Sequence, residues 1–420
     1  MGKFYETACS TWGEEEVEKK INSKSIFTNV LFENEKLQIA LYVQDDLIPL
    51  YELCLSKKGA SRIIIPIDYT IKEAFKMASE FGSTILIWDD GLDVCQTFKL
   101  HSCVANKVSM NKGTIGFVTS GTTGYPKIVL KDEDILINEG KMVFKDLGIE
   151  KFKSIFINVK QSHSYGYLYG VVIPFLHRVK VNMMNLFSVK LYKNIEQSLI
   201  ITSPASVKKI LDTIYSDSIL TIVSAGKELT SINELLRSRK IKLFDQYGTT
   251  ETGVIWINKF YHQEDDINVI EQSLFGNIIK YEDAYFESSH TMIGYIKNKE
   301  IDFQNKIKLA DIIERESGIF KIIGRKDNVI NKNGEKFSPE RIESIIEEYT
   351  EIEQCLVILN KKGVLVCKYV SNKPVNVPSI VEILRKNVVS YAIPKVYEKV
   401  EEKSILSSNG KKIRYFREEM

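Results

Sequence analysis

The stretch Thr119-Ser120-Gly121-Thr122-Thr123-Gly124-Tyr125-Pro126-Lys127 decides how this sequence is interpreted. It follows a β-like run at residues 113–118 and consists mainly of hydroxyl side chains and glycines. Glycine lets a backbone bend and approach a ligand closely, while the hydroxyls, the loop N–H groups and the lysine supply donors and a positive charge. We therefore expect a loop that wraps a polyphosphate.

Two other interpretations of this stretch are weaker. Clusters of Gly, Ser and Thr commonly form polar surface turns, and the loop taken alone allows that. A Walker-type phosphate loop needs Lys and then Ser or Thr after its second glycine. Gly116 and Gly121 have the required spacing, but Thr122-Thr123 follow, which excludes a kinase or GTPase loop of that kind. The stretch instead resembles the phosphate loop of the adenylate-forming superfamily: acyl-CoA synthetases, aryl acid ligases and peptide-synthetase adenylation domains.

Length and composition set the broad class. The chain has 420 residues, of which 44% are hydrophobic, so two or three globular domains are expected. A net charge of +2 gives no reason to expect a nucleic acid or a membrane as partner. No window is long enough for a membrane span, the six cysteines form no CxxC pair, and the N-terminus has no signal sequence. These features predict a cytoplasmic protein without a metal cluster or disulfides.

The first hundred residues alternate between strand and helix patterns. Residues 37–43, 62–68 and 84–88 are strand-like, and helices are predicted at 47–57 and 71–81. Apolar strands separated by such helices indicate βαβ units and a mostly parallel sheet. A helix at 133–147 and a strand at 154–159 follow the phosphate loop.

The resemblance implies an α/β fold with two domains. Residues 1–326 would form a large N-terminal domain of mostly parallel sheets with flanking helices, which binds ATP and the acid. Residues 327–420 would form a small, mobile α+β lid, in which Ser338 caps a helix at 340–349. The segment before Lys58 is shorter than is usual in the family, so a trimmed N-terminus is expected.

A second motif lies at residues 161–170, where a histidine stands among tyrosines and glycines. A lone histidine is more often structural, but the resemblance implies that His163, Ser164, Tyr165 and Gly166 line the acid pocket near the reacting carboxylate. A general-base role for His163 is less favoured, because a carboxylate is already ionised near neutral pH. The amino-acid-activating branch has Asp in place of Ser164. A hydroxyl cannot pair with a buried ammonium, so we expect an aliphatic or aromatic acid and not an α-amino acid.

Two further segments resemble nucleotide-binding elements of the family. The small residues Ser224, Ala225 and Gly226 follow a strand and would leave room for substrate and adenine. In the segment 244–253 the resemblance implies that Tyr247 stacks on adenine, that the Thr250 hydroxyl contacts a phosphate and that the Glu251 carboxylate binds Mg²⁺. Hard oxygen ligands suit that ion. The nucleotide-binding residues of this segment would be Tyr247, Gly248, Thr249, Thr250 and Glu251.

The remaining expected site residues lie toward the C-terminus. The resemblance implies that Asp311 holds the ribose and that Arg325 reaches the nucleotide. Asp327 would be the hinge, and Gly334 would let a pantetheine arm pass the backbone. The terminal Asn409-Gly410-Lys411-Lys412 resembles the family's catalytic-lysine motif, and the flanking Gly410 and Arg414 assign that role to Lys411.

The resemblance thus implies ATP-dependent activation of a carboxylic acid to an acyl-adenylate, release of pyrophosphate, and transfer to a thiol. The acceptor would be CoA or the phosphopantetheine of a carrier protein, and the residues do not separate the two. A non-catalytic adenylate-binding protein is the alternative from another class. The catalytic set would be Lys411, Glu251, Thr250, Arg325 and His163. The ATP-binding set would add Thr119, Ser120, Gly121, Thr122, Thr123, Gly124 and Lys127 to the segments above.

Overall fold

A computed structural model of the chain describes a defined set of residues, and all structural statements below concern these. They are residues 4, 11, 15–16, 38–89, 95–100, 113–119, 126–185, 195–213, 220–225, 241–261, 271–279, 284–297, 300–325, 330–332, 335–360, 364–388, 390–406 and 412. The chain forms two compact units. Unit 1 comprises Met1–Lys227, Arg239–Asn277 and Phe286–Ile307, and unit 2 comprises Glu228–Ser238, Ile278–Tyr285 and Lys308–Met420.

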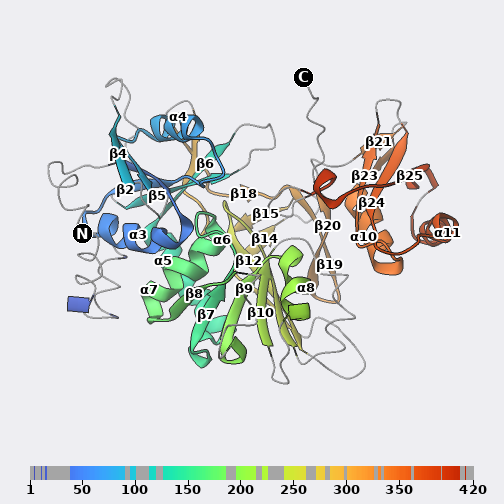
Figure 1. Ribbon diagram of the computed structural model, residues 1–420, viewed down its shortest axis with the longest axis horizontal. Coiled ribbons are helices and arrows are strands. Elements are labelled where there is room, and N and C mark those ends of the chain that lie inside the picture. The colour runs from blue at the N-terminus through green and yellow to red at the C-terminus, as the bar shows by residue number, and fades with distance from the viewer. Residues whose placement is uncertain are drawn as a thin grey trace. The chain divides into compact units, whose positions relative to one another are not determined.

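Unit 1 contains an 8-stranded sheet of order β17-β16-β6-β5-β2-β1-β3-β4 (Figure 1). Its interior pairs β1–β2, β1–β3 and β2–β5 are parallel, and the flanking pairs are antiparallel. The strands are β1 Gln38–Val43, β2 Ser61–Ile64, β3 Ile85–Asp89, β4 Cys95–Lys99, β5 Thr114–Thr119, β6 Lys127–Asp132, β16 Gly294–Lys297 and β17 Glu300–Phe303.

A second, 7-stranded sheet of unit 1 has the order β13-β12-β11-β10-β9-β7-β8. Strands β7 to β11 form the parallel part of this sheet. Strands β12 and β13 extend it with antiparallel pairing. The strands are β7 Ser154–Ile157, β8 Lys180–Met183, β9 Ser198–Thr202, β10 Leu220–Ala225, β11 Ile241–Thr249, β12 Gly253–Tyr261 and β13 Glu271–Leu274. The expected α/β fold is confirmed, with antiparallel strands at the edges of parallel sheet interiors.

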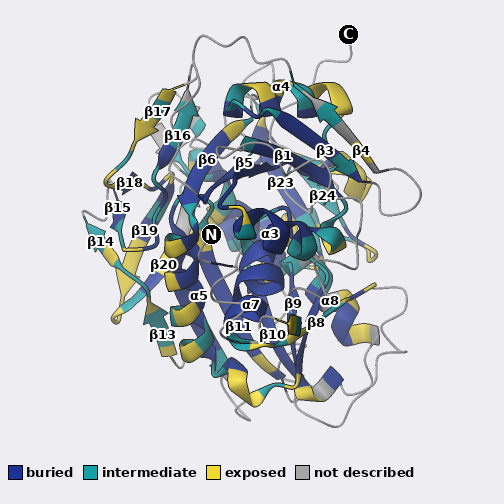
Figure 2. Cartoon of the chain, turned by 90° about the vertical axis from the view of Figure 1, so that its left-hand side faces the viewer, coloured by how far each residue is buried: buried dark blue, intermediate teal, exposed yellow. Residues whose placement is uncertain are grey.

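Helices α3, α5 and α7 pack into the core between the two sheets; α3 and α7 are largely buried, whereas α5 also has an exposed face (Figure 2). Helix α4 covers the other face of the first sheet, and α8 contacts β10 of the second sheet. The α-helices of unit 1 are α3 Ile48–Lys57, α4 Ile71–Phe81, α5 Glu133–Leu147, α6 Ser164–Tyr167, α7 Ile173–His177 and α8 Pro204–Thr213. Short turns η2 Asp45–Leu47, η3 Ile149–Lys151 and η6 Ile195–Gln197 and the π-helix η4 Leu168–Val172 complete the unit.

The sequence accounts for these helix ends and for the core. A capping box of Thr70 and Glu73 begins α4, and Gly82, with φ of 78°, ends it. Strand β1 serves two cores because its side chains alternate between the two faces of the sheet. Ile39 and Leu41 pack in the core between the sheets, whereas Ala40 packs beneath α4.

The described part of unit 2 contains small sheets and two α-helices. Antiparallel pairs join β19 Asp311–Glu316 to β20 Ile319–Arg325 and β21 Ile330–Lys332 to β22 Glu335–Phe337. Strands β23 Gln354–Leu359, β24 Leu365–Val370 and β25 Val396–Lys399 form a third sheet. The helices are α10 Pro339–Tyr349 and α11 Val377–Asn387, with the short turns η10 Ser390–Ala392 and η11 Glu402–Ser404. A further sheet of the chain has the order β14-β15-β18, with strands Asn277–Ile279, Tyr285–Glu287 and Ile307–Lys308.

Some local expectations need correction. Strand β7 ends at Ile157, not at residue 159. Strand β2 ends at Ile64, not at residue 68; Pro66 cannot continue the ladder, because proline has no N–H to donate. Ser338 is the N-cap residue of α10, but its hydroxyl donates to the Glu340 carboxylate at 2.7 Å and makes no capping bond. The domain boundary after residue 326 stays a prediction, since residues 326–329 lie outside the described part. Among the described residues, no helix combines the length and apolar character needed to cross a membrane.

Candidate active site

The expected phosphate loop connects two paired strands of the first sheet. Thr119, the last residue of β5, pairs with Lys127, the first residue of β6. The antiparallel register therefore places both residues at the same edge of the sheet, with the Lys127 side chain exposed. The intervening Ser120, Gly121, Thr122, Thr123 and Gly124 lie outside the described residues, and their roles stay predictions.

The expected metal carboxylate lies on a tight turn between β11 and β12. The Thr249 amide donates to the Thr252 hydroxyl at 3.0 Å, and the Met292 amide donates to the Glu251 carbonyl at 2.7 Å. A Cβ at Gly248 would lie 2.2 Å from the Gly253 carbonyl oxygen, so only glycine fits there. Hydrogen bonds and close backbone packing therefore fix the segment that carries Thr250 and Glu251.

Tyr295 on β16 links this turn to the phosphate-loop lysine. Its hydroxyl donates to Glu251 Oε1 at 3.2 Å, and Lys127 Nζ lies 5.5 Å from the centroid of its ring. Burial, together with the neighbouring Glu251 carboxylate, raises the pKa of the Tyr295 hydroxyl above its ordinary value. The hydroxyl therefore keeps its proton, and it acts as a donor to the carboxylate.

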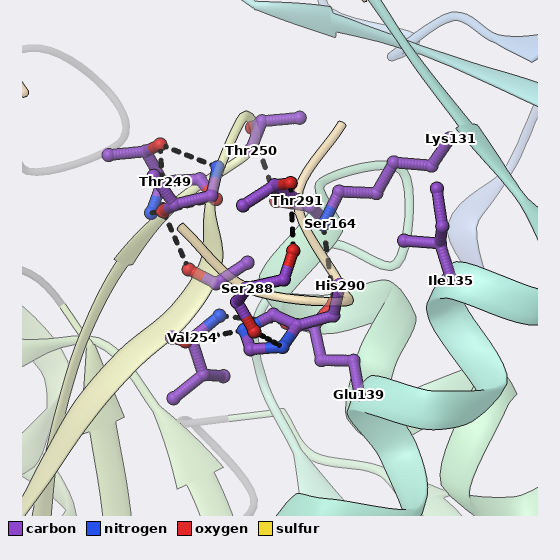
Figure 3. Close-up of polar contacts among 12 residues, drawn as sticks. Lys131, Ile135, Glu139, Ser164, Thr249, Thr250, Val254, Ser288, His290 and Thr291 are labelled. Atoms are coloured by element: carbon purple, nitrogen blue, oxygen red, sulfur yellow. Dashed lines mark hydrogen bonds and ion pairs between the residues drawn. The ribbon is translucent and has the colours of Figure 1, made fainter. Parts of the chain in front are cut away.

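A buried polar network supports the turn from behind (Figure 3). The Glu139 carboxylate on α5 accepts from the Val254 amide at 2.9 Å and from Lys131 Nζ at 3.2 Å. His290 Nε2 contacts the Val254 carbonyl at 2.7 Å, and Ser288 Oγ contacts His290 Nδ1 at 2.6 Å. A carbonyl can only accept, so Nε2 carries the proton. The Ser288 hydroxyl also donates to the Phe275 carbonyl at 2.9 Å, so its single proton lies within reach of both that carbonyl and Nδ1. Burial lowers the pKa of His290, which favours the neutral form of the ring.

The expected acid-pocket segment contacts the same turn. His163 is the N-cap residue of α6, and the hydroxyl oxygens of Ser164 and Thr250 lie 3.1 Å apart (Figure 3). A Cβ at Gly166 would lie 2.0 Å from the Lys160 carbonyl oxygen, so this glycine is required by packing. The structure thus joins two motifs that are far apart in the sequence, and it gives Gly166 a structural role that the pocket assignment did not anticipate.

Tyr165 extends from α6 to the carboxyl ends of two parallel strands. Its hydroxyl lies 3.0 Å from the Val223 carbonyl of β10 and 3.2 Å from the Thr202 carbonyl of β9. Ligands of α/β proteins commonly bind at this edge of a parallel sheet. Ser224 and Ala225 end β10 here, and the Ser224 side chain is fully buried.

Other expected nucleotide-binding residues lie in separate places. The Tyr247 ring is 8% exposed and packs against Trp256, with ring centroids 4.3 Å apart, so it is held firmly at the end of β11. In unit 2, Asp311 and Arg325 are directly paired across β19 and β20. Their stacking, ribose and nucleotide contacts stay predictions.

The terminal lysines of unit 2 are distinguished by the contacts of Lys412. Its ammonium lies 2.9 Å from Glu343 and 2.6 Å from Glu347, and it also bonds to the Cys355 carbonyl. Burial favours the neutral amine, but the two carboxylates outweigh that effect and raise the pKa of Lys412. Lys412 is therefore a charged structural anchor. The other expected residues Gly226, Asp327, Gly334 and Lys411 lie outside the described residues.

Sequence reasoning missed Tyr295, Glu139, Lys131, His290 and Ser288 as parts of this site. A polar run at residues 287–291 before a strand was the only signal for His290 and Ser288. Nothing in the sequence indicated that these residues and α5 meet behind the Glu251 turn.

Comparison with solved structures defines the class of fold. The structure of O-succinylbenzoate coenzyme A synthetase from Bacillus subtilis in complex with AMP superposes with a TM-score of 0.73 at 16% identity, covering 100% of this chain and 93% of that one. ATP-bound MatB from Rhodopseudomonas palustris gives a TM-score of 0.70 at 12% identity, covering 94% and 90%. The fold is that of the adenylate-forming enzymes.

Sequence relatives point to the same superfamily, although the chain matches no protein-family model. It is 23% identical to a 2-succinylbenzoate–CoA ligase of Haemophilus influenzae over 296 residues, which are 64% of each chain. It is 22% identical to a 3,4-dihydroxybenzoate–[aryl-carrier protein] ligase of Bacillus anthracis over 381 residues, 87% of each. The chain is accordingly similar in sequence to acid–thiol ligases and has the fold of the adenylate-forming enzymes. The matches to several relatives span less than two thirds of those proteins, at 64%, 49% and 65% of their lengths.

Proposed function

We propose that this protein is an acid–thiol ligase that forms AMP. A carboxylate oxygen attacks the α-phosphorus of ATP, the bond to the β-phosphate oxygen breaks, and pyrophosphate leaves. A thiol then attacks the acyl carbon of the acyl-adenylate. AMP leaves, the thiol proton is released, and a thioester is formed.

One observation carries this proposal: contacts connect the motifs expected to bind phosphate, metal and acid. Lys127 lies over Tyr295, whose hydroxyl bonds to Glu251. Thr250, the neighbour of Glu251, contacts Ser164 of the acid-pocket segment. An arrangement that presents a cation, a carboxylate and hydroxyls together suits a reaction between a polyphosphate and a carboxylate.

The residues present fit Mg²⁺ and ATP. Glu251 offers one hard carboxylate, and Mg²⁺ is commonly held by one or two carboxylates together with substrate phosphates and water. Bound there, the ion would screen the charge on the phosphate oxygens. Thr119, Lys127 and Thr250 would hold the β- and γ-phosphates, and each preorganised donor of this kind is worth a few kcal/mol in the transition state.

The lid lysine that bridges the carboxylate and the α-phosphate is proposed to be Lys411. Lys412 cannot serve, because its ammonium is bound by Glu343 and Glu347. The thiol needs the space that Lys411 occupies in the first step. We therefore propose a rotation of the small domain about Asp327, which exchanges the Lys411 face for the Gly334 face. Asp327→Pro should spare adenylate formation and impair thioester formation.

The acid is proposed to be aliphatic or aromatic and to lack an α-amino group. Ser164 stands where the amino-acid-activating branch carries Asp, and its hydroxyl contacts Thr250. Leaving a buried ammonium without a carboxylate partner would be costly. Named relatives act on aryl and fatty acids with CoA or an aryl-carrier protein. Both acceptors are therefore included in the test below. The cytoplasm is the proposed compartment.

The proposal is tested by acid-dependent exchange of labelled pyrophosphate into ATP. A panel of aliphatic and aromatic acids is expected to contain at least one that supports exchange in the presence of Mg²⁺. Parallel reactions with CoA and with a phosphopantetheinylated carrier protein then identify the acceptor. Binding of ATP without exchange for any acid would contradict the proposal and would favour a non-catalytic adenylate-binding protein.

A further inference from the structure

Tyr295 lies on strand β16, which pairs with strand β6. It pairs directly with Val129 in an antiparallel register, and directly paired residues project from the same face of a sheet. Side chains two positions apart on a strand share a face, so Lys127 and Lys131 project from that face as well. The ring of Tyr295 therefore lies diagonally next to Lys127, which agrees with the 5.5 Å between Lys127 Nζ and the ring centroid.

The backbone around Tyr295 holds the ring and the Glu251 turn in one rigid arrangement. The Met292 amide donates to the Glu251 carbonyl at 2.7 Å, and the Ile293 amide donates to the Leu130 carbonyl at 2.8 Å. A Cβ at Gly294 would lie 2.2 Å from the Asp302 carbonyl oxygen, so the strand entering Tyr295 packs tightly against β17. The distance of 3.2 Å between the Tyr295 hydroxyl and Glu251 Oε1 thus rests on fixed backbone on both sides.

Tyr295 contacts two groups of opposite charge, the Lys127 ammonium and the Glu251 carboxylate. Lys127 and Glu251 are both described, and no ion pair within 4 Å joins them in this part of the structure. Tyr295 contacts each of them differently, because its face attracts the ammonium and its hydroxyl donates to the carboxylate. A direct Lys–Glu pair would largely neutralise both groups, whereas a tyrosine leaves the net charge of each unchanged.

We infer that Tyr295 is a positioning residue that keeps Lys127 and Glu251 apart and separately available, the lysine for the terminal phosphates of ATP and the carboxylate for Mg²⁺. This inference rests on the proposed function, because it assigns ligands to the two charged groups. Tyr295 thereby becomes part of the site. Its ring positions the lysine, and its hydroxyl positions the carboxylate.

The distinction can be measured by calorimetric binding of ATP, with Mg²⁺ and with a chelator in its place, to the full chain. Tyr295→Phe keeps the ring and removes the hydroxyl. We expect it to bind metal-free ATP like the wild type and MgATP about tenfold more weakly. Tyr295→Leu removes both contacts and is expected to weaken the binding of both forms by about tenfold or more.

A matched control is available in Tyr285, whose ring lies 5.9 Å from Lys308 Nζ in a similar cation–π contact. Tyr285→Leu should leave the affinity for both forms of ATP unchanged, which separates a specific role from the general loss of a tyrosine. Thermal unfolding of each variant checks its folding, and Tyr295→Phe serves where Tyr295→Leu does not fold.

Three results would overturn the inference. Wild-type affinity for MgATP in Tyr295→Phe and Tyr295→Leu would show that the tyrosine positions nothing. An equal loss in Tyr285→Leu would show a non-specific effect. If the wild type binds ATP in neither form, the proposed function fails and this inference fails with it. In the first of these cases the wild type still binds MgATP, so only the inference on Tyr295 fails.

Discussion

The hydroxyl oxygens of Ser164 and Thr250 lie 3.1 Å apart, so the N-terminus of α6 contacts the turn that carries Glu251. The two residues belong to motifs that the sequence places far apart, and each motif alone could be a polar loop. Their contact joins the proposed acid pocket to the proposed phosphate and metal site, which is where a carboxylate must meet ATP.

The contact predicts unequal effects of removing either hydroxyl. Thr250→Val should lower acid-dependent pyrophosphate exchange by roughly 10- to 100-fold, because a donor to a developing phosphate charge is lost. Ser164→Ala should lower it only a few-fold, since that hydroxyl serves the pocket and the contact. The double variant should be less impaired than the product of the single effects, because both singles remove the same contact. Strict additivity would show that the contact has no energetic role.

The terminal lysines are predicted to differ in the kind of defect that they produce. Lys411→Ala should abolish adenylate formation yet still convert supplied acyl-adenylate and thiol to thioester, because it removes a group used in one step only. Lys412→Met would leave the buried carboxylates of Glu343 and Glu347 without their cation, which should cost about 3–5 kcal/mol of stability. Both half-reactions should then fall together with the folded fraction.

Half-reaction assays and urea unfolding of the two lysine variants check this prediction. The reverse pattern, a stable Lys412→Met with only adenylation lost, would assign the catalytic role to Lys412.

A buried ion cluster near α3 is predicted to stabilise unit 1. Arg62 lies 2.7 Å from Glu133 and donates through Nε to Glu52 at 2.8 Å, with all three side chains almost fully buried. Arg62→Met leaves two buried carboxylates without a cation, so we expect a loss of about 3–5 kcal/mol in urea unfolding. The exposed pair of Lys306 and Glu287 supplies the control, and Lys306→Met should cost less than about 1 kcal/mol. Similar losses would contradict the prediction.

His290 is predicted to make stability depend on pH. Burial lowers its pKa in the folded state, while the unfolded value is about 6.5. Between the two values the unfolded chain binds a proton that the folded chain does not. Stability should therefore fall as the pH decreases through about 6.5 and level off below the folded pKa.

His290→Gln keeps a donor for the Val254 carbonyl but does not titrate. Urea unfolding of this variant should show a smaller loss of stability between neutral and acidic pH than the wild type. Because burial also lowers the pKa of His177, the variant should retain part of the dependence. Identical pH profiles for the two proteins would exclude a contribution from His290.

The sequence predicted local structure well where the signals were local. Helix α4 occupies Ile71–Phe81 as expected, because Thr70, Glu73 and Gly82 specify both of its ends. The order of the motifs predicted a resemblance to the adenylate-forming superfamily, and the fold agrees with it. Helix α5 was similarly marked by Asp132, whose side chain accepts from the Ile135 amide, and by Gly148.

The parts of the site that could not be predicted depend on long-range pairing. Tyr295 contacts Lys127 only because β16 pairs with β6, and no local pattern specifies that neighbour. Glu139 looks like any polar helix residue in the sequence, yet it is buried against the Val254 amide. Gly166 was expected to line the acid pocket and Gly248 to bind the nucleotide, and the close packing of backbone oxygens against both glycines was not predictable from the sequence.

In the proposed reaction a carboxylate oxygen becomes bonded to the α-phosphorus of ATP. Transfer of an oxygen isotope from the acid to AMP detects that bond. An acid that supports exchange is labelled with ¹⁸O in its carboxylate and incubated with ATP, Mg²⁺, the thiol acceptor and the enzyme. The proposed reaction should place one ¹⁸O atom in the AMP released with each thioester, and none in pyrophosphate. Unlabelled AMP, or label appearing in inorganic phosphate together with ADP, would contradict it.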